Sequence, residues 1–132
     1  MAQFDPARLK KIAVYASGGD APGMNAAIRA VVRAGVVNNL EVCGFVGGYS
    51  GIYENNFIPL DLRSVANIIQ RGGSVLKAGR RTEFMQPEGR KKAVANIRAL
   101  GIQAMVCIGG DGSFNGAHAL WNEYQIPVVG VP

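Results

Sequence analysis

The sequence is poor in the residues that build metal clusters and disulfide scaffolds, and it has no long apolar run. It contains two cysteines, Cys43 and Cys107, and one histidine, His118. Each cysteine is flanked by apolar residues, as is typical of a small core residue, and one histidine without companions cannot build a metal site. No segment approaches the roughly 18 consecutive apolar residues of a membrane span, and the N-terminus lacks the apolar middle of a secretory signal. We therefore expect a cytoplasmic protein with no membrane partner.

The composition is that of a single globular domain with an excess of glycine. Apolar residues make up 48% of the 132 residues and charged residues 17%, which argues against a disordered chain. This length suits one domain of ordinary size. The 18 glycines are nearly twice the roughly 7% of average usage, and many of them are clustered. Clustered glycine predicts places where the backbone must approach something closely.

The net charge of +5 is concentrated in one segment. The basic residues of this segment are Arg71, Lys77, Arg80, Arg81, Arg90, Lys91 and Lys92, against Glu83 and Glu88, while the rest of the chain is balanced. A local basic patch indicates a local anionic partner. Phe84 is the only aromatic residue in the segment, which is a poor pattern for nucleic acid binding. Phosphate on a small molecule fits the pattern better.

Alternating apolar runs and amphipathic segments predict a three-layer, Rossmann-like α/β fold, a parallel sheet with helices on both faces. We expect strands at residues 11–16, 41–46, 103–108 and 127–131, and a brief edge strand at 57–61 weakened by Pro59. We expect helices at residues 22–37, 64–71, 87–101 and roughly 114–124, and a loop at 72–86. In the first helix Ala26, Ala27, Ala30, Val31 and Ala34 form one face, with Arg29 and Arg33 opposite.

One device occurs twice in the chain: a strand, then Gly-Gly-Asp, then small residues and a helix. Its copies are IAVYASGGDAPGMNAA, from Ile12, and AMVCIGGDGSFNGAHA, from Ala104. Because the carboxyl ends of parallel strands lie along one edge of a sheet, we expect both turns to open onto the same crevice. Bare glycine backbone followed by a helix N-terminus suits phosphate oxygens. The pattern therefore predicts a polyphosphate site in this crevice.

Several side chains near these turns have a chemistry that suits a polyphosphate. The Asp111 carboxylate would repel phosphate unless a divalent cation lay between them, so we interpret it as a ligand of Mg²⁺, directly or through water. Asp20 could do the same, or it could cap the following helix or brace the turn. Arg80 and Arg81 could stabilise charge on a transferred phosphoryl group or lie in solvent. Tyr49, in the glycine cluster at 47–51, could pack against a bound base or ribose or close a turn, and the pattern favours the turn.

Four segments, in this order and at these separations, resemble the N-terminal part of the bacterial-type 6-phosphofructokinases. They are SGGDAPGMNAAIR (17–29), GGYSGIYE (47–54), RGGSVLKAGR (71–80) and IGGDGSFNGA (108–117). The similarity runs from about Lys11 to Pro132. It implies that residues 1–132 are an incomplete N-terminal, ATP-binding domain of that fold. It also implies transfer of the γ-phosphoryl group of ATP to fructose 6-phosphate in glycolysis, giving fructose 1,6-bisphosphate and ADP.

The resemblance also implies roles for particular residues. The implied ATP-binding residues are Gly19, Arg80, Arg81, Gly110, Asp111, Gly112 and Ser113, and Asp111 would engage Mg²⁺. We add Tyr49 to the candidate ATP-binding residues because of its position in the glycine cluster. Glycine at position 112 matches the ATP-using enzymes, whereas pyrophosphate-using relatives tend to carry aspartate there. Arg29 and Arg33 match an allosteric site for nucleoside diphosphate and phosphoenolpyruvate between subunits of a homotetramer.

The chain departs from the family pattern at three places. Lys77 stands where the family usually has small residues, which adds charge beside the phosphates. Leu62 and Asn67 stand where bacterial enzymes often have arginine and aspartate, which weakens the expectation of an effector response. The family's catalytic aspartate, in a Thr-Ile-Asp-Asn-Asp motif, and its second, sugar-binding domain lie beyond the position of Pro132. We therefore expect no catalytic base within these residues and no turnover by the isolated 132-residue chain.

Other functions remain open at this stage. NAD kinases and lipid kinases also carry a GGDG turn after a strand, but they are not expected to have GGDAPGMN on the first turn as well. A pyrophosphate-dependent phosphofructokinase and a non-catalytic nucleotide-binding module are the main alternatives. A nicotinamide dehydrogenase would need G-x-G-x-x-G after its first strand, and SGGDAPG does not supply that spacing.

Overall fold

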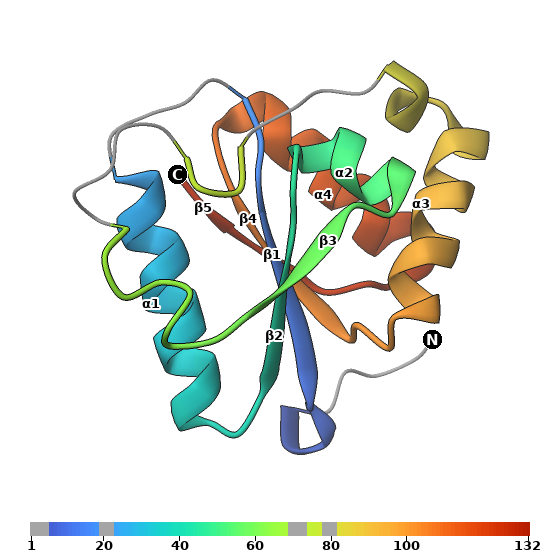
Figure 1. The fold of residues 1–132 in the computed structure, drawn as a ribbon. Coiled ribbons are helices and arrows are strands. Elements are labelled where there is room, and N and C mark those ends of the chain that lie inside the picture. Colours follow the sequence, from blue (N-terminus) through green and yellow to red (C-terminus); the bar gives the residue numbers. More distant parts are fainter. Residues whose placement is uncertain (1–5, 19–22, 69–73, 78–81) are drawn as a thin grey trace.

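The computed structural model describes residues 6–18, 23–68, 74–77 and 82–132 (Figure 1). Its strands are β1 (Lys11–Ala16), β2 (Glu41–Phe45), β3 (Phe57–Leu60), β4 (Ala104–Ile108) and β5 (Val128–Val131). Its α-helices are α1 (Met24–Val37), α2 (Gly48–Glu54), α3 (Pro87–Ala99) and α4 (Asp111–Tyr124). Two 3-10 helices, η1 (Pro6–Arg8) and η2 (Thr82–Met85), complete the described elements. Within these residues, no helix is long and apolar enough to cross a membrane.

The strands form one sheet in the order β3-β2-β1-β4-β5. The pairs β1 with β2, β1 with β4, and β4 with β5 are parallel, as expected. The edge strand β3 departs from this and pairs antiparallel with β2. The connection between them, residues 46–56, is shorter than the dozen or more residues that a parallel crossover needs. Pro59 is tolerated in β3 because an edge strand leaves one row of backbone groups unpaired.

Helices cover both faces of the sheet, which confirms the three-layer α/β architecture. Figure 1 shows α1 alone on one side, with α2, α3 and α4 on the other. Successive side chains of β1 lie on opposite faces of the sheet. Val14 is in the apolar cluster beneath α1, and Tyr15 is in the cluster beneath the other helices. Because successive side chains of a strand point to opposite faces, β1 is buried on both sides and forms the centre of the molecule.

The buried face of α1 differs from the expected alanine face. Met24, Ile28 and Val32 are buried against the sheet, whereas Ala26 and Ala30 are exposed. Ala34, from the same expected face, is also exposed. The larger aliphatic side chains recur at i, i+4 and remove more apolar surface from water than alanine does, at about 25 cal/mol per Å², so they determine which face is buried.

Three local predictions were wrong. Residues 62–67 form turns instead of the first part of a helix over 64–71, whose later residues lie outside the described ranges. The Asp61 backbone N–H donates to Ser64 Oγ at 2.8 Å and the Ser64 N–H donates to Asp61 Oδ1 at 2.9 Å, and such local bonds compete with helix formation. The glycine cluster from Gly48 onward is helical, as α2, and η2 interrupts the expected loop over 72–86.

Lys77 has a backbone conformation that disfavours its side chain. Its φ of 57° is in the left-handed region, which costs a residue other than glycine on the order of 1 kcal/mol or more. We expect Lys77→Gly to raise the free energy of unfolding by about 0.5–1 kcal/mol, since part of the relieved strain is offset by the greater freedom of glycine in the unfolded chain. Urea denaturation measures this change.

The matched control is Lys91→Gly. Lys91 is an exposed lysine inside α3, where glycine should lower the free energy of unfolding by about 1 kcal/mol. Opposite signs for the two lysine-to-glycine changes are expected. A destabilised Lys77→Gly variant would mean that the left-handed backbone at this position does not strain the chain.

Candidate functional site

The two glycine turns that follow β1 and β4 lie in contact. The backbone N–H of Ser17 donates to the carbonyl of Ile108 at 2.9 Å, so hydrogen bonding between the strands continues into the turns. A Cβ placed on Gly109 would lie 2.6 Å from both Ser17 O and Ser113 Oγ, and one on Gly18 would lie 3.6 Å from Ser113 Oγ. The predicted shared edge is therefore confirmed for these residues. Gly19 and Asp20 themselves lie outside the described ranges.

Helix α4 begins within the second turn, at Asp111, three residues earlier than the sequence predicted. Gly110 precedes it in an extended conformation, and its carbonyl accepts from the N–H groups of Ser113 and Phe114 at 3.0 and 3.2 Å. The backbone N–H groups of Asp111 and Gly112 therefore belong to the first turn, where no i−4 carbonyl is available. Together with the positive end of the helix dipole, such groups favour an anion.

The glycines of the two turns fall into two kinds. Gly18 has a φ of 86°, and Gly109 has no space for a side chain, so conformation and packing require glycine at these two positions. A Cβ on Gly110 or Gly112, by contrast, would meet no atom of the described residues within 4 Å, and neither glycine has a positive φ. Packing among the described residues therefore does not require glycine at 110 or 112. Close approach of the backbone to a bound group would explain both.

Asn25 ties the basic segment to the same edge of the sheet. Its buried side chain donates from Nδ2 to the carbonyl of Ile68 at 3.0 Å, and its Oδ1 accepts from the N–H of Val75 at 2.7 Å. The carbonyl of Leu76 accepts from the N–H of Gly47, at the end of β2, at 2.9 Å. These bonds fix the chain on both sides of residues 69–73. Asn25 was not singled out from the sequence because its partners are 43 and 50 residues away.

Two of the expected ATP ligands, Arg80 and Arg81, lie outside the described residues, as does Arg71. Arg90, from the same basic segment, is used inside the protein. It forms an ion pair with Glu123 of α4, with Nη2 2.9 Å from Oε2, and donates from Nη1 to the carbonyl of Phe84 at 3.0 Å. Arg90 therefore braces η2, which directly follows Arg81, against α4.

Tyr49 lies beneath the second turn rather than at its surface. Its ring is 6% exposed, and its hydroxyl donates to the carbonyl of Ser113. A Cβ on Gly116 would lie 2.7 Å from Tyr49 Oη, so glycine in α4 leaves room for the ring. The geometry supports a role for Tyr49 in holding the turn, and a direct contact with ATP stays a prediction. The turn interpretation missed this role because the partner is 64 residues away.

The metal assignment depends on Asp111. Its backbone opens α4, while its side chain is not among those described. Within the described part of the chain, no group of three or more His, Cys, Asp or Glu residues could hold a metal ion. Mg²⁺ commonly binds through one or two carboxylates and the phosphates of a substrate, with waters completing its shell. One carboxylate at the start of a turn whose backbone suits phosphate oxygens fits that donor set.

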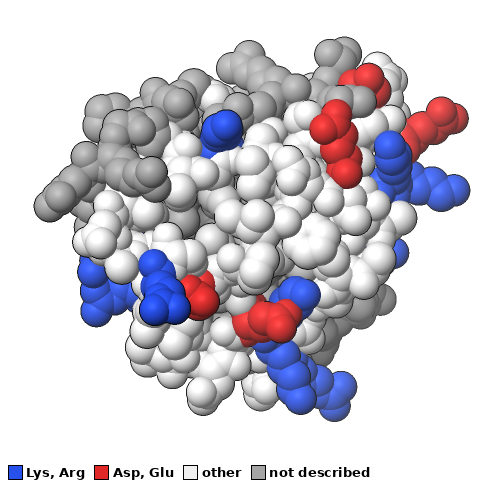
Figure 2. Space-filling view, in the orientation of Figure 1, with Lys and Arg blue, Asp and Glu red and all other residues white. Residues whose placement is uncertain are grey.

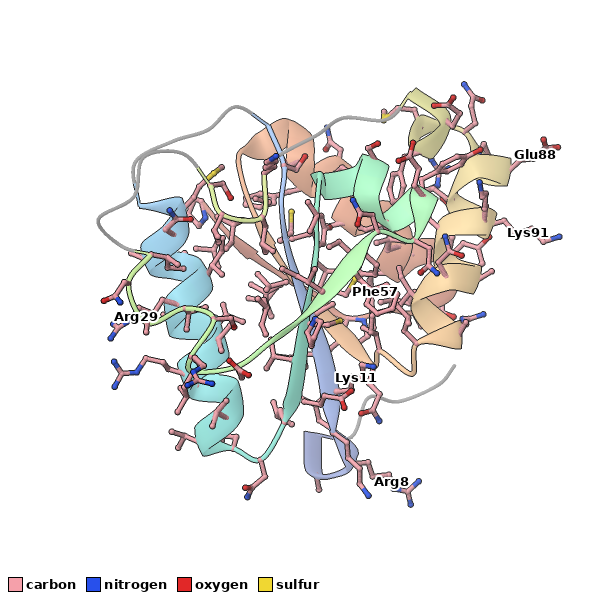
Figure 3. All side chains as sticks on the ribbon, viewed as in Figure 1. Arg8, Lys11, Arg29, Phe57, Glu88 and Lys91 are labelled. Atoms are coloured by element: carbon pink, nitrogen blue, oxygen red, sulfur yellow. The ribbon has the colours of Figure 1, made fainter. Side chains whose placement is uncertain are left out.

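A second hollow lies away from the crevice, against the outer side of α1. It has a volume of about 230 Å³ and is lined by Arg29, Arg33, Leu62, Val65 and Ala66. Figure 3 shows Arg29 projecting outward from α1, and Figure 2 shows a group of basic side chains over this side of the molecule. The structure thus brings the two arginines together, with Leu62 beside them. Asn67 is not part of this lining.

Comparison with known proteins identifies the family. The phosphofructokinase family model matches residues 11–132. This chain belongs to the phosphofructokinase family. The ATP-dependent 6-phosphofructokinase of Cytophaga hutchinsonii is 61% identical over 94% of the chain, and ATP-dependent 6-phosphofructokinase 1 of Thermus thermophilus is 55% identical over the same share. The chain spans 38% of the length of each of these two relatives.

Solved structures of phosphofructokinases share the fold of this chain. The enzyme of Saccharomyces cerevisiae superimposes on 92% of the chain with a TM-score of 0.84 and 36% identity, the match covering 20% of the yeast chain. The Pichia pastoris enzyme in the T-state covers 99% with a TM-score of 0.85 and 34% identity, over 16% of its own length. A pyrophosphate-dependent phosphofructokinase from Marinobacter aquaeolei, with a TM-score of 0.78, is 19% identical over 33% of its chain and 94% of this one, and shows the fold alone.

Proposed function

We propose that this chain forms the ATP-binding part of an ATP-dependent 6-phosphofructokinase. The enzyme would transfer the γ-phosphoryl group of ATP to fructose 6-phosphate, giving fructose 1,6-bisphosphate and ADP in glycolysis. The observation that carries the proposal is the pair of open glycines, Gly110 and Gly112, at the start of α4 and beside the turn at Ser17 and Gly18. These glycines expose their backbone at the topological switch point between β1 and β4. Exposed backbone at such a point is suited to binding a polyphosphate.

The residues of the crevice would act mainly by positioning the donor. The first-turn N–H groups of α4 would bind phosphate oxygens, and the helix dipole would favour their charge. Mg²⁺, when bound, supplies charge neutralisation on the phosphates, and the Asp111 carboxylate would hold it there. Arg80 and Arg81, outside the described residues, keep the charge-stabilising role that the family resemblance implies.

Glycine at position 112 supports ATP, instead of pyrophosphate, as the proposed phosphoryl donor. A Cβ at Gly112 would meet no atom within 4 Å in the part of the chain that the structure describes, so packing there would accept an aspartate. Pyrophosphate-using relatives tend to carry aspartate at this position, whose charge would add to the repulsion of a bulky triphosphate. The two ATP-dependent relatives that are 61% and 55% identical to this chain support the same choice.

Calorimetric titration tests this donor assignment. The complete gene product should bind Mg-ATP more tightly than Mg-pyrophosphate and should form fructose 1,6-bisphosphate in a coupled assay. A clear preference for pyrophosphate would overturn the donor assignment. The purified 132-residue polypeptide should bind Mg-ATP without forming sugar bisphosphate, because the family's catalytic aspartate is not among its residues. Turnover by that polypeptide would contradict the division of roles proposed for this chain.

The hollow on α1 supports a second, regulatory site. We propose that Arg29 and Arg33 bind a phosphorylated effector between subunits of a homotetramer in the cytoplasm. Two guanidinium groups beside a hollow of about 230 Å³ suit a small phosphorylated molecule. Leu62 contributes an apolar side chain to the same hollow, so we expect a weaker effector response than in enzymes with arginine there. Activity assays with nucleoside diphosphate or phosphoenolpyruvate measure that response.

A further inference from the structure

A chain of two hydroxyl groups links the centre of the sheet to the first turn of α4. Tyr15, on β1, is fully buried, and its hydroxyl donates to Tyr49 Oη at 3.1 Å. The Tyr49 hydroxyl in turn donates to the carbonyl of Ser113. Ser113 is part of the glycine turn, and its Oγ lies close to Gly18 and Gly109. The two hydroxyls therefore lead to the backbone of Ser113, a residue whose side chain lies beside glycines of both turns.

The number of hydroxyl protons determines which tyrosine donates to which. Each phenol has one proton to donate, and the Tyr49 proton goes to the carbonyl of Ser113, so Tyr15 is the donor in the bond between the two hydroxyls. Burial raises the pKa of Tyr15 well above its ordinary value, and Tyr49 and Cys107 beside it raise it further. Burial also raises the pKa of Tyr49. Both hydroxyls therefore stay protonated at physiological pH.

The Tyr49 ring is in contact with both α4 and η2. On one side it lies against Gly116 and the Ser113 carbonyl of α4. On the other side its centroid is 4.3 Å from that of Phe84, in η2, the element that follows Arg80 and Arg81. Tyr15 packs edge-on against the same ring, with centroids 5.1 Å apart and an interplanar angle of 63°. Tyr49 is thus in contact with both the turn that begins α4 and η2, which lies within the basic segment.

We propose that Tyr15 is a positioning residue for the ATP site, acting through Tyr49 to hold the first turn of α4. The proposal rests on the ATP-dependent function proposed above. Phenylalanine would fill the same volume in β1, so packing does not require the hydroxyl of Tyr15. A buried hydroxyl costs free energy unless it is hydrogen-bonded, and here it donates to Tyr49, with the Cys107 thiol also in contact with it. What the hydroxyl supplies is a fixed orientation for the donor to Ser113.

The test is a Tyr15→Phe variant of the complete gene product. Loss of one buried hydrogen bond beneath the turn should raise the KM for ATP by about threefold. The KM for fructose 6-phosphate and kcat should stay unchanged, whereas simple loss of folded protein would lower kcat and leave both KM values unchanged. Tyr124→Phe, the same chemical change at the far end of α4, should alter neither KM.

A double-mutant cycle separates positioning through Tyr49 from an independent effect. Tyr49→Phe should also raise the KM for ATP, and adding Tyr15→Phe to it should cause no further rise.

An unchanged KM for ATP in Tyr15→Phe, or a full additional rise in the double variant, overturns the proposal, while ATP turnover by the wild type leaves the proposed function standing. If Tyr15→Phe does not fold, the Tyr49→Phe variant tests the proposal instead. An unchanged KM for ATP in Tyr49→Phe also overturns the proposal. A wild-type enzyme that does not use ATP would instead refute the proposed function.

Discussion

Replacing Asp111 with asparagine is expected to lower kcat/KM for ATP by about 100-fold or more, the range found when a group that stabilises transition-state charge is removed. The change is nearly isosteric and removes only the charge of the first residue of α4. A carboxylate beside a triphosphate is useful when it holds Mg²⁺, and asparagine is a much weaker ligand for that ion. Stability should fall by no more than about 1 kcal/mol, the usual contribution of an acidic residue at a helix N-terminus.

The matched control for this variant is Glu88→Gln. Glu88 is an exposed acid in the first turn of α3, and Figure 3 shows it projecting away from the body of the molecule. Steady-state kinetics at several Mg²⁺ concentrations should separate the two variants. We expect Glu88→Gln to match the wild type, with the loss confined to Asp111→Asn. Asp111→Asn activity within threefold of the wild type would remove the metal role from this residue.

Replacing Gly89 with alanine is expected to lower the free energy of unfolding by about 3 kcal/mol, the upper part of the range for overpacked sites. Gly89 lies in α3, and a Cβ there would be 1.8 Å from the carbonyl oxygen and 2.5 Å from the carbonyl carbon of Glu83. These are backbone atoms of η2, so no side-chain rotation can relieve the contact. The two elements must separate, which would draw Phe84 away from Tyr49.

Thermal and urea denaturation of the complete gene product measure this effect. For a domain of this size the expected loss corresponds to a decrease in Tm of roughly 10 °C. Gly112→Ala is the control for folding, because a Cβ there meets no atom of residues 6–18, 23–68, 74–77 and 82–132 within 4 Å and alanine is the better helix former. If Gly89→Ala were as stable as Gly112→Ala, the close packing of α3 on η2 would be wrong.

The strands were the part of the fold most accessible from sequence. Each is a short apolar run bounded by glycine, proline or polar residues, so the predicted and observed limits agree closely. The helix expected over 64–71 failed because Asp61 and Ser64 bond to each other's backbone, and helical spacing does not reveal such competition. The face of α1 was misjudged because several alanines outnumber the three larger residues that determine burial.

The crevice could be predicted because it depends on topology. Parallel strands end on one edge, and two Gly-Gly-Asp turns in the sequence therefore meet, as Ser17 and Gly109 show. The supporting residues could not be predicted, because their roles depend on partners far along the chain. From the sequence, Tyr49 is interpreted as part of a turn, and only the structure shows its contact with Ser113. Arg90 is likewise interpreted as part of a basic patch, and only the structure shows its ion pair with Glu123.

Backbone amide NMR during a Mg-ATP titration tests the shared crevice most directly. The account predicts that the amide resonances of Ser17 and Gly18, after β1, and of Gly110 and Gly112, after β4, shift together with one common dissociation constant. A response confined to one of the two turns, or two turns that saturate at different ATP concentrations, would contradict it.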